Sequence, residues 1–158
     1  MGDWRDLPSA PAPGTVLCAL EETTEGGGKE VVFGTGHEAF RVLLLRMGAG
    51  VVAYHNCCPH FSLPLNYEPD LFHVFDGEDL MCAHHTAMFK IATGECFDGP
   101  CAGAKLTKVP VAVIDDKIVI ASPPASGRRG SQDRGPCTTN CASHHPLRLP
   151  SGRGRGKG

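Results

Sequence analysis

Apolar and β-branched residues recur in short runs along the first three quarters of the chain. The runs cover residues 15–20, 30–33, 39–46, 51–55, 80–83, 88–91, 109–114 and 118–121. Turn-forming pairs and triplets of Gly, Asp and Thr separate them, which is typical of strands joined by tight turns. No stretch of 12 residues keeps a 3.6-residue apolar period, so helices are not expected beyond a short helical turn within residues 68–75. The pattern predicts an all-β fold of antiparallel sheets, a sandwich or a small barrel.

Composition divides the chain into three parts. Residues 1–13 are polar and interrupted by Pro, which suggests a flexible lead-in, and residues 14–121 hold the strand-like runs. Residues 122–158 contain 7 Gly, 5 Pro and 5 Ser. Such a segment buries too little apolar surface to offset its ordering entropy, so we expect a disordered C-terminal tail.

Charge follows the same division. Residues 1–121 carry 8 Lys and Arg against 16 Asp and Glu, a net charge of −8, whereas residues 122–158 carry 7 against 1, a net charge of +6. We therefore expect an acidic body that repels nucleic acid and suits a basic partner surface, followed by a basic tail.

The distribution of apolar residues also bears on location. No run approaches 18 consecutive apolar residues, and the first residues lack the apolar core of a secretory signal. We expect a cytoplasmic protein with no membrane span. In that reducing compartment eight cysteines indicate metal binding more often than disulfides.

Four residues form the strongest chemical signal. Cys58 and His60 are followed after 21 residues by Cys82 and His85, giving C-x-H and C-x-x-H, each placed at the end of a predicted strand. Such a set could bind Zn²⁺ or an iron–sulfur cluster. A zinc finger usually pairs Cys with Cys and His with His along the chain. Mixed loops suit a binuclear cluster, in which the two thiolates bind one iron and the two imidazoles the other.

These loops and their surroundings resemble the Rieske-type [2Fe-2S] ferredoxins over roughly residues 14–121. Residues 51–56 resemble the strand that enters the first loop, Pro64 and Leu65 the apolar cover, and residues 93–96 with Gly99-Pro100 the segment after the second loop. The resemblance implies antiparallel sheets with a cluster-binding subdomain at one tip and one [2Fe-2S] cluster. Carried over residue by residue, Cys58 and Cys82 would bind the inner iron, and His60 and His85 the outer, more exposed one.

The chain departs from that family at several positions. Thr86 replaces the usual Gly after the second His, so the turn there could differ, and His84 replaces a common Trp. Leu63 and His84 stand where high-potential members have two disulfide-bonded cysteines, and Ala87 and Phe89 replace their Ser and Tyr hydrogen-bond donors. Hydrogen bonds to cluster sulfurs raise the potential. Without them we expect a midpoint in the lower half of the Rieske range, about −150 to 0 mV.

The function that this resemblance implies is that of a soluble one-electron carrier without a catalytic centre of its own. It would pass electrons from a flavin-dependent reductase to an oxygenase or similar acceptor, as a monomer or weak oligomer that binds neither nucleic acid nor membranes. Two alternatives remain open at this point: the small subunit of an assimilatory nitrite reductase-like complex, and a Cys2His2 zinc module that serves interactions only.

The remaining cysteines suggest structural roles. Cys57 adjoins Cys58 but is expected to point into its strand's own core, and Cys18 is expected to be a buried apolar residue. Cys96 and Cys101 flank the Gly-Pro segment at a spacing that could form a disulfide, although two free thiols are the stronger expectation in the cytosol.

Overall fold

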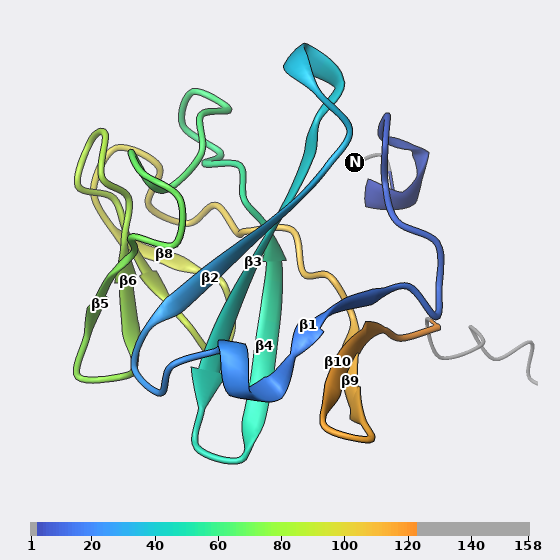
Figure 1. Ribbon diagram of the computed structural model, residues 1–158. Coiled ribbons are helices and arrows are strands. Elements are labelled where there is room, and N and C mark those ends of the chain that lie inside the picture. Colours follow the sequence, from blue (N-terminus) through green and yellow to red (C-terminus); the bar gives the residue numbers. More distant parts are fainter. Residues whose placement is uncertain (1–2, 123–158) are drawn as a thin grey trace, which may run out of the picture. The chain divides into compact units, whose positions relative to one another are not determined.

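The computed structural model describes residues 3–122, and this part of the chain folds into antiparallel sheets with three short 3-10 helices (Figure 1). The predicted all-β class is confirmed. One sheet has the order β1 (Val16–Ala19), β10 (Lys117–Ile120), β9 (Val111–Ile114), and a second has β2 (Gly28–Phe33), β3 (Phe40–Met47), β4 (Gly50–His55). A third has β5 (His73–Phe75), β6 (Asp79–Met81), β7 (Met88–Lys90), β8 (Cys96–Asp98). The 3-10 helices are Trp4–Asp6, Leu20–Glu22 and Gly36–Glu38. The tail predicted over residues 122–158 lies outside the described residues, apart from its first position.

Strand β3 separates two apolar cores. Because side chains alternate between the two faces of a strand, Val42 and Leu44 enter the first core while Leu43 and Leu45 enter the second. All four side chains are buried. Burial on both faces explains why this strand reads as a continuous apolar run rather than as an alternating one.

The first core fills the space between β3 and the β1–β10–β9 sheet and includes Cys18, Ile118 and Ile120. Trp4 joins it and packs against Phe40 with ring centroids 5.7 Å apart. The lead-in thus reaches the core at Trp4, a contact that its polar composition did not suggest.

The second core supports the cysteine–histidine loops. It joins the other face of β3 to the β5–β8 sheet and includes Cys58, Cys82 and Cys96. Tyr54 lies fully buried within it, and its hydroxyl donates to the Ile91 carbonyl at 2.6 Å. The position of the loops therefore depends on the second core, which is built from segments far apart in sequence.

One local prediction is wrong. The helical turn expected within residues 68–75 is a tight turn, in which the Leu71 amide donates to the Glu68 carbonyl at 3.2 Å, followed by strand β5. Strand β5 pairs with β6 through Val74 and Leu80. Three residues carry too little periodicity to identify a strand, and the hairpin partner decides the conformation. Strand β8 was also missed, because it does not lie in a longer apolar run of the kind that marked the equally short β6 and β7.

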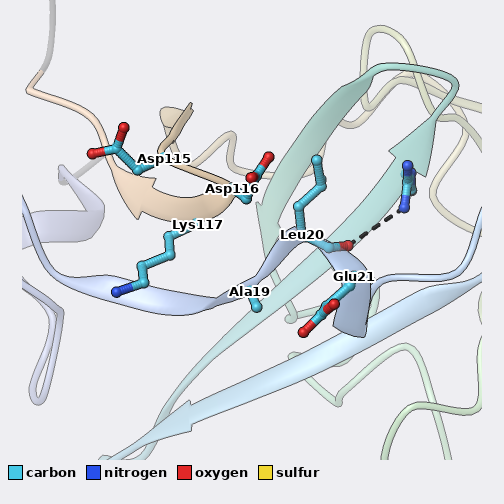
Figure 2. A pocket seen from close by; sticks show the side chains of 7 residues that line it. Ala19, Leu20, Glu21, Asp115, Asp116 and Lys117 are labelled. Carbon is cyan, nitrogen blue, oxygen red and sulfur yellow. Dashed lines mark hydrogen bonds between the residues drawn. The ribbon is translucent and has the colours of Figure 1, made fainter.

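Arg46 binds the backbone of the segment that follows β1, near the β9–β10 turn. Its guanidinium donates to the carbonyls of Leu20 at 3.4 Å and Thr23 at 3.2 Å. Figure 2 draws the bond to the Leu20 carbonyl as a dashed line. A cavity of about 500 Å³ lies beside it, lined by residues that include Glu21, Asp116 and Lys117. No cysteine or histidine lines this cavity, so it is separate from the predicted metal ligands.

Within residues 3–122, no helix has the length and apolar character needed to cross a membrane.

Candidate metal centre

Two loops with the same backbone hydrogen bonds carry the four predicted ligands. In the first, which follows β4, the Cys58 amide donates to the Leu63 carbonyl at 2.7 Å and the Ser62 amide to the Cys58 carbonyl at 2.8 Å. In the second, between β6 and β7, the Cys82 amide donates to the Ala87 carbonyl at 2.8 Å and the Thr86 amide to the Cys82 carbonyl at 3.0 Å. Each cysteine therefore begins a closed six-residue loop.

The structure brings the two predicted thiol ligands together inside the second core. Cys58 is 2% exposed and Cys82 is fully buried. Burial raises the pKa of the Cys82 thiol, and the nearby Cys58 thiol adds to this, while the backbone N–H groups of His84 and His85 point at the sulfur and lower it. Hydrogen bonds to a thiolate favour the charged form, which is the form that binds metal.

The two predicted imidazole ligands also meet, but at the surface. The rings of His60 and His85 lie edge to face with centroids 4.8 Å apart. His85 is exposed, and Nδ1 of His60 is buried without a hydrogen-bond partner. A buried ring nitrogen without a partner normally costs free energy, so metal coordination at Nδ1 would satisfy it.

A buried polar network holds the first loop in place. Asn56, 2% exposed, donates to Asn66 at 2.7 Å and to Glu30 at 2.9 Å, and its carbonyl accepts from the Leu65 amide at 2.8 Å. Glu30 is in turn paired with Arg41 at 3.1 Å. This network fixes Leu65, the predicted apolar cover, which is fully buried. Sequence reasoning used Asn56 only as part of a resemblance and missed this role.

Packing of backbone on backbone holds the second loop. A Cβ added to Gly99 would lie 2.8 Å from Cα of Ala87, and Gly99 has φ of +101°. The Ala83 amide donates to the Leu65 carbonyl at 2.8 Å, which joins the second loop to the cover of the first. The Gly-Pro segment therefore packs against the second loop.

The donor set suits a binuclear group. Within residues 3–122, no three His, Cys, Asp or Glu side chains converge on one ion position. The thiols form one pair and the imidazoles another, which matches a cluster whose two irons have different ligands. A structural zinc site would instead need four donors around one ion.

Comparison with known proteins agrees with this geometry. The sequence profile of the Rieske [2Fe-2S] domain matches residues 15–124. The chain belongs to the Rieske [2Fe-2S] domain family. A domain of this family binds a [2Fe-2S] cluster, which confirms the predicted family and cofactor.

Solved structures share the Rieske fold. The Sphingomonas yanoikuyae B1 ferredoxin has a TM-score of 0.56 and 23% identity, covering 70% of this chain and 99% of its own. The ferredoxin of carbazole 1,9a-dioxygenase from Nocardioides aromaticivorans IC177 has a TM-score of 0.55 and 24% identity, covering 71% and 100%. The terminal oxygenase of carbazole 1,9a-dioxygenase from Novosphingobium sp. KA1 has a TM-score of 0.56 and 17% identity, covering 75% of this chain and 31% of its own. Among curated proteins, none matches this chain.

The departures from the Rieske pattern are accommodated locally. Thr86 adopts the left-handed conformation with φ of +57°, and so does Ser62 at the equivalent place in the first loop. The turn after the second His therefore keeps a conformation in which Gly would be unstrained. His84 packs edge to face on Tyr67 with centroids 4.3 Å apart.

The other cysteines of the described chain stand outside the ligand pairs. Cys57 is half-buried beside Ser62, and burial raises the pKa of its thiol. Cys18 is buried in the first core. Cys101 lies near Cys58. The pKa of its thiol is raised to about 12, mainly by burial and secondly by the neighbouring Cys96 thiol.

Proposed function

We propose that this chain is a one-electron carrier in which Cys58 and Cys82 bind the inner iron of the cluster and His60 and His85 the outer iron. The observation that carries the proposal is the segregation of the four side chains: two buried thiols in contact and two imidazoles that meet at the surface. Bound there, the [2Fe-2S] cluster supplies reversible one-electron chemistry.

The residues of the chain set where the electron can enter and leave. Burial of Cys58 and Cys82 excludes water from the thiolate side. On the other side, His85 is exposed and Phe61, 63% exposed, packs over both imidazoles with centroid distances of 4.1 and 5.2 Å. An imidazole bound through one nitrogen leaves the other N–H free to donate to solvent or a partner. Electron transfer is therefore expected at the His60–His85 edge.

The proposed partners are a flavin-dependent reductase as donor and a terminal oxygenase as acceptor. The two matched ferredoxins are covered along 99% and 100% of their own length, which supports a carrier. One matched structure is described as a complex of reduced oxygenase and oxidized ferredoxin in carbazole 1,9a-dioxygenase. The net charge of −8 over residues 1–121 suits a basic docking surface. We infer that the carrier works in the cytoplasm, as a monomer or weak oligomer.

The test is metal analysis combined with electron transfer. Full-length protein prepared without oxygen should contain two irons and two sulfides per chain, and should pass electrons from a flavin-dependent reductase to a Rieske-type oxygenase. Stoichiometric zinc in a colourless protein would instead support the interaction module. Electron acceptance by an assimilatory nitrite reductase but not by oxygenases would support the nitrite reductase alternative.

Protein-film voltammetry sharpens this test. Ala87 and Phe89 are fully buried and offer no side-chain donors to the site. The midpoint at pH 7 should therefore lie in the lower half of the Rieske range, about −150 to 0 mV. A midpoint above about +150 mV would contradict an oxygenase-type carrier.

A further inference from the structure

Cys96 and Cys101 form a second pair of sulfur atoms beside the candidate metal centre. The Cys101 thiol donates to Sγ of Cys96 at 3.4 Å, and the Cys96 thiol donates to the Asp98 carbonyl at 3.2 Å. Both residues contact the second core, in which Cys58 and Cys82 also lie. Neither belongs to the proposed ligand set, so this pair is available for chemistry of its own.

The fold of residues 96–104 brings the two sulfurs together. The amide of Cys96 donates to the Ala104 carbonyl and the amide of Gly103 returns to the Cys96 carbonyl, both at 2.8 Å. Within this segment, the Ala104 amide donates to the Cys101 carbonyl at 2.9 Å and closes a tight turn. The segment therefore doubles back on itself and places Cys101 over Cys96.

Little movement separates this arrangement from a covalent bond. A disulfide has an S–S distance of about 2.05 Å, so the sulfurs need to approach by about 1.4 Å. Gly103, with φ of +89° and nothing within 4 Å of its Cβ position, gives the returning backbone room to adjust. Within residues 3–122, the other cysteines outside the ligand pair, Cys18 and Cys57, have no thiol hydrogen-bonded to them.

We propose that Cys96 and Cys101 form a reversible disulfide, which makes the segment beside the second loop a two-electron thiol–disulfide site in addition to the cluster. The oxidant is a low-molecular-weight disulfide of the glutathione class. Cys101 is the sulfur that the oxidant can reach first, because it is half-buried whereas Cys96 is 1% exposed.

The thiol–disulfide exchange proceeds in two steps. The Cys101 sulfur attacks one sulfur of glutathione disulfide, which breaks the S–S bond and releases one glutathione with the proton of Cys101. The Cys96 sulfur then attacks the Cys101 sulfur of the mixed disulfide, forming the Cys96–Cys101 bond and releasing the second glutathione with the proton of Cys96. Two electrons pass from the cysteine sulfurs to glutathione disulfide.

Peptide mapping tests the proposal directly, because trypsin places the pair in a peptide of its own. Residues 91–105 follow Lys90, end at Lys105 and contain Cys96 and Cys101 as their only cysteines. Full-length protein with its cluster is equilibrated with defined ratios of oxidised to reduced glutathione, quenched in acid, alkylated with iodoacetamide and digested. The expected product is an unalkylated form of this peptide that is two hydrogen atoms lighter than the reduced peptide. Its fraction should rise with the ratio of oxidised to reduced glutathione and return to zero after treatment with dithiothreitol.

The peptide of residues 6–29, which contains Cys18, serves as the reference and should stay alkylated throughout. Two alkyl groups on residues 91–105 at every ratio would overturn the proposal, and so would a glutathione adduct that never closes. In Cys96→Ser, Cys101 should retain one glutathione, and in Cys101→Ser, Cys96 should remain alkylated. Iron content, measured on the same samples, reports on the proposed function independently of this result.

Discussion

The two cysteine–histidine loops have the same backbone design but different supports. In each, the cysteine amide bonds to the carbonyl five residues later, and the amide four residues later returns to the cysteine carbonyl. The residue at that fourth position has φ of +57° in both loops. The histidine, however, stands two residues after Cys58 and three after Cys82. The same loop with a shifted histidine places both thiols inward while the two imidazoles face each other.

What holds each loop explains how one design tolerates different sequences. The first loop depends on side-chain hydrogen bonds from the buried Asn56. The second depends on close backbone packing of Gly99 on Ala87. Directional bonds fix the first loop and excluded volume fixes the second, so the two loops should fail in different ways when their supports are removed.

Loss of the cluster is expected when either predicted thiol ligand is removed. Cys58→Ser and Cys82→Ser should each abolish iron binding and visible absorbance, because in the proposed assignment the inner iron loses one of its two thiolates. Iron analysis and absorption spectra measure this. Cys57→Ser, next to Cys58, is the control and should keep nearly normal iron content. A colourless Cys57→Ser protein beside a coloured Cys58→Ser protein would reverse the assignment in the first loop.

Removing the support of the first loop should cost less than loss of the cluster but still be severe. Asn56→Ala deletes three hydrogen bonds and leaves buried partners unsatisfied, so unfolding free energy should fall by about 3 kcal/mol. Denaturant unfolding measures it. Asn66→Ala keeps the bond from Asn56 to the Leu65 amide and should cost clearly less. Equal losses in the two variants would show that Asn56 is not the centre of the network.

A matched pair of glycines tests the support of the second loop. Gly99→Ala and Gly103→Ala both place a Cβ at positive φ, with a cost of about 1 kcal/mol. Only Gly99→Ala forces a backbone contact, with Ala87, which adds about 2 kcal/mol. Thermal or denaturant unfolding separates the two variants. Similar losses would mean that the Gly-Pro segment does not press on the second loop.

The smallest effect is a gain in stability at the fourth position of the loops. Thr86 is exposed and its left-handed backbone costs about 1–2 kcal/mol. Thr86→Gly should recover that cost, less the greater entropy of glycine in the unfolded chain, for a net gain of about 0.5–1 kcal/mol. Ser62→Gly should gain less because the Ser62 side chain lies beside the Cys57 thiol and lowers its pKa, an interaction that glycine cannot make. A loss of stability in Thr86→Gly, seen in denaturant unfolding, would show that the threonine side chain has a role of its own.

Local patterns in the sequence were enough to predict the all-β class, the strands of the two main sheets and the family. These depend on local patterns: alternation or continuity of apolar residues, turn residues between them, and the C-x-H and C-x-x-H spacing. It also indicated four ligands, Cys58, His60, Cys82 and His85. Both these ligands and their assignment to individual irons stay predictions. Strands β5 and β8 were missed although the equally short β6 and β7 were predicted, because β5 lies in a segment interpreted as a helical turn and β8 lies in no apolar run of four or more residues.

The surroundings of the predicted ligands depend on contacts between segments that are distant in sequence. The bonds from Asn56 to Asn66 and Glu30 span 10 and 26 residues of sequence, and Trp4 reaches Phe40 from outside the sheets. Spacing left open whether Cys96 and Cys101 would be neighbours, and the double turn of residues 96–104 settled it. A local pattern specifies strands and loops, but packing between distant segments decides which side chains meet, because each contact depends on where the rest of the chain places its partner.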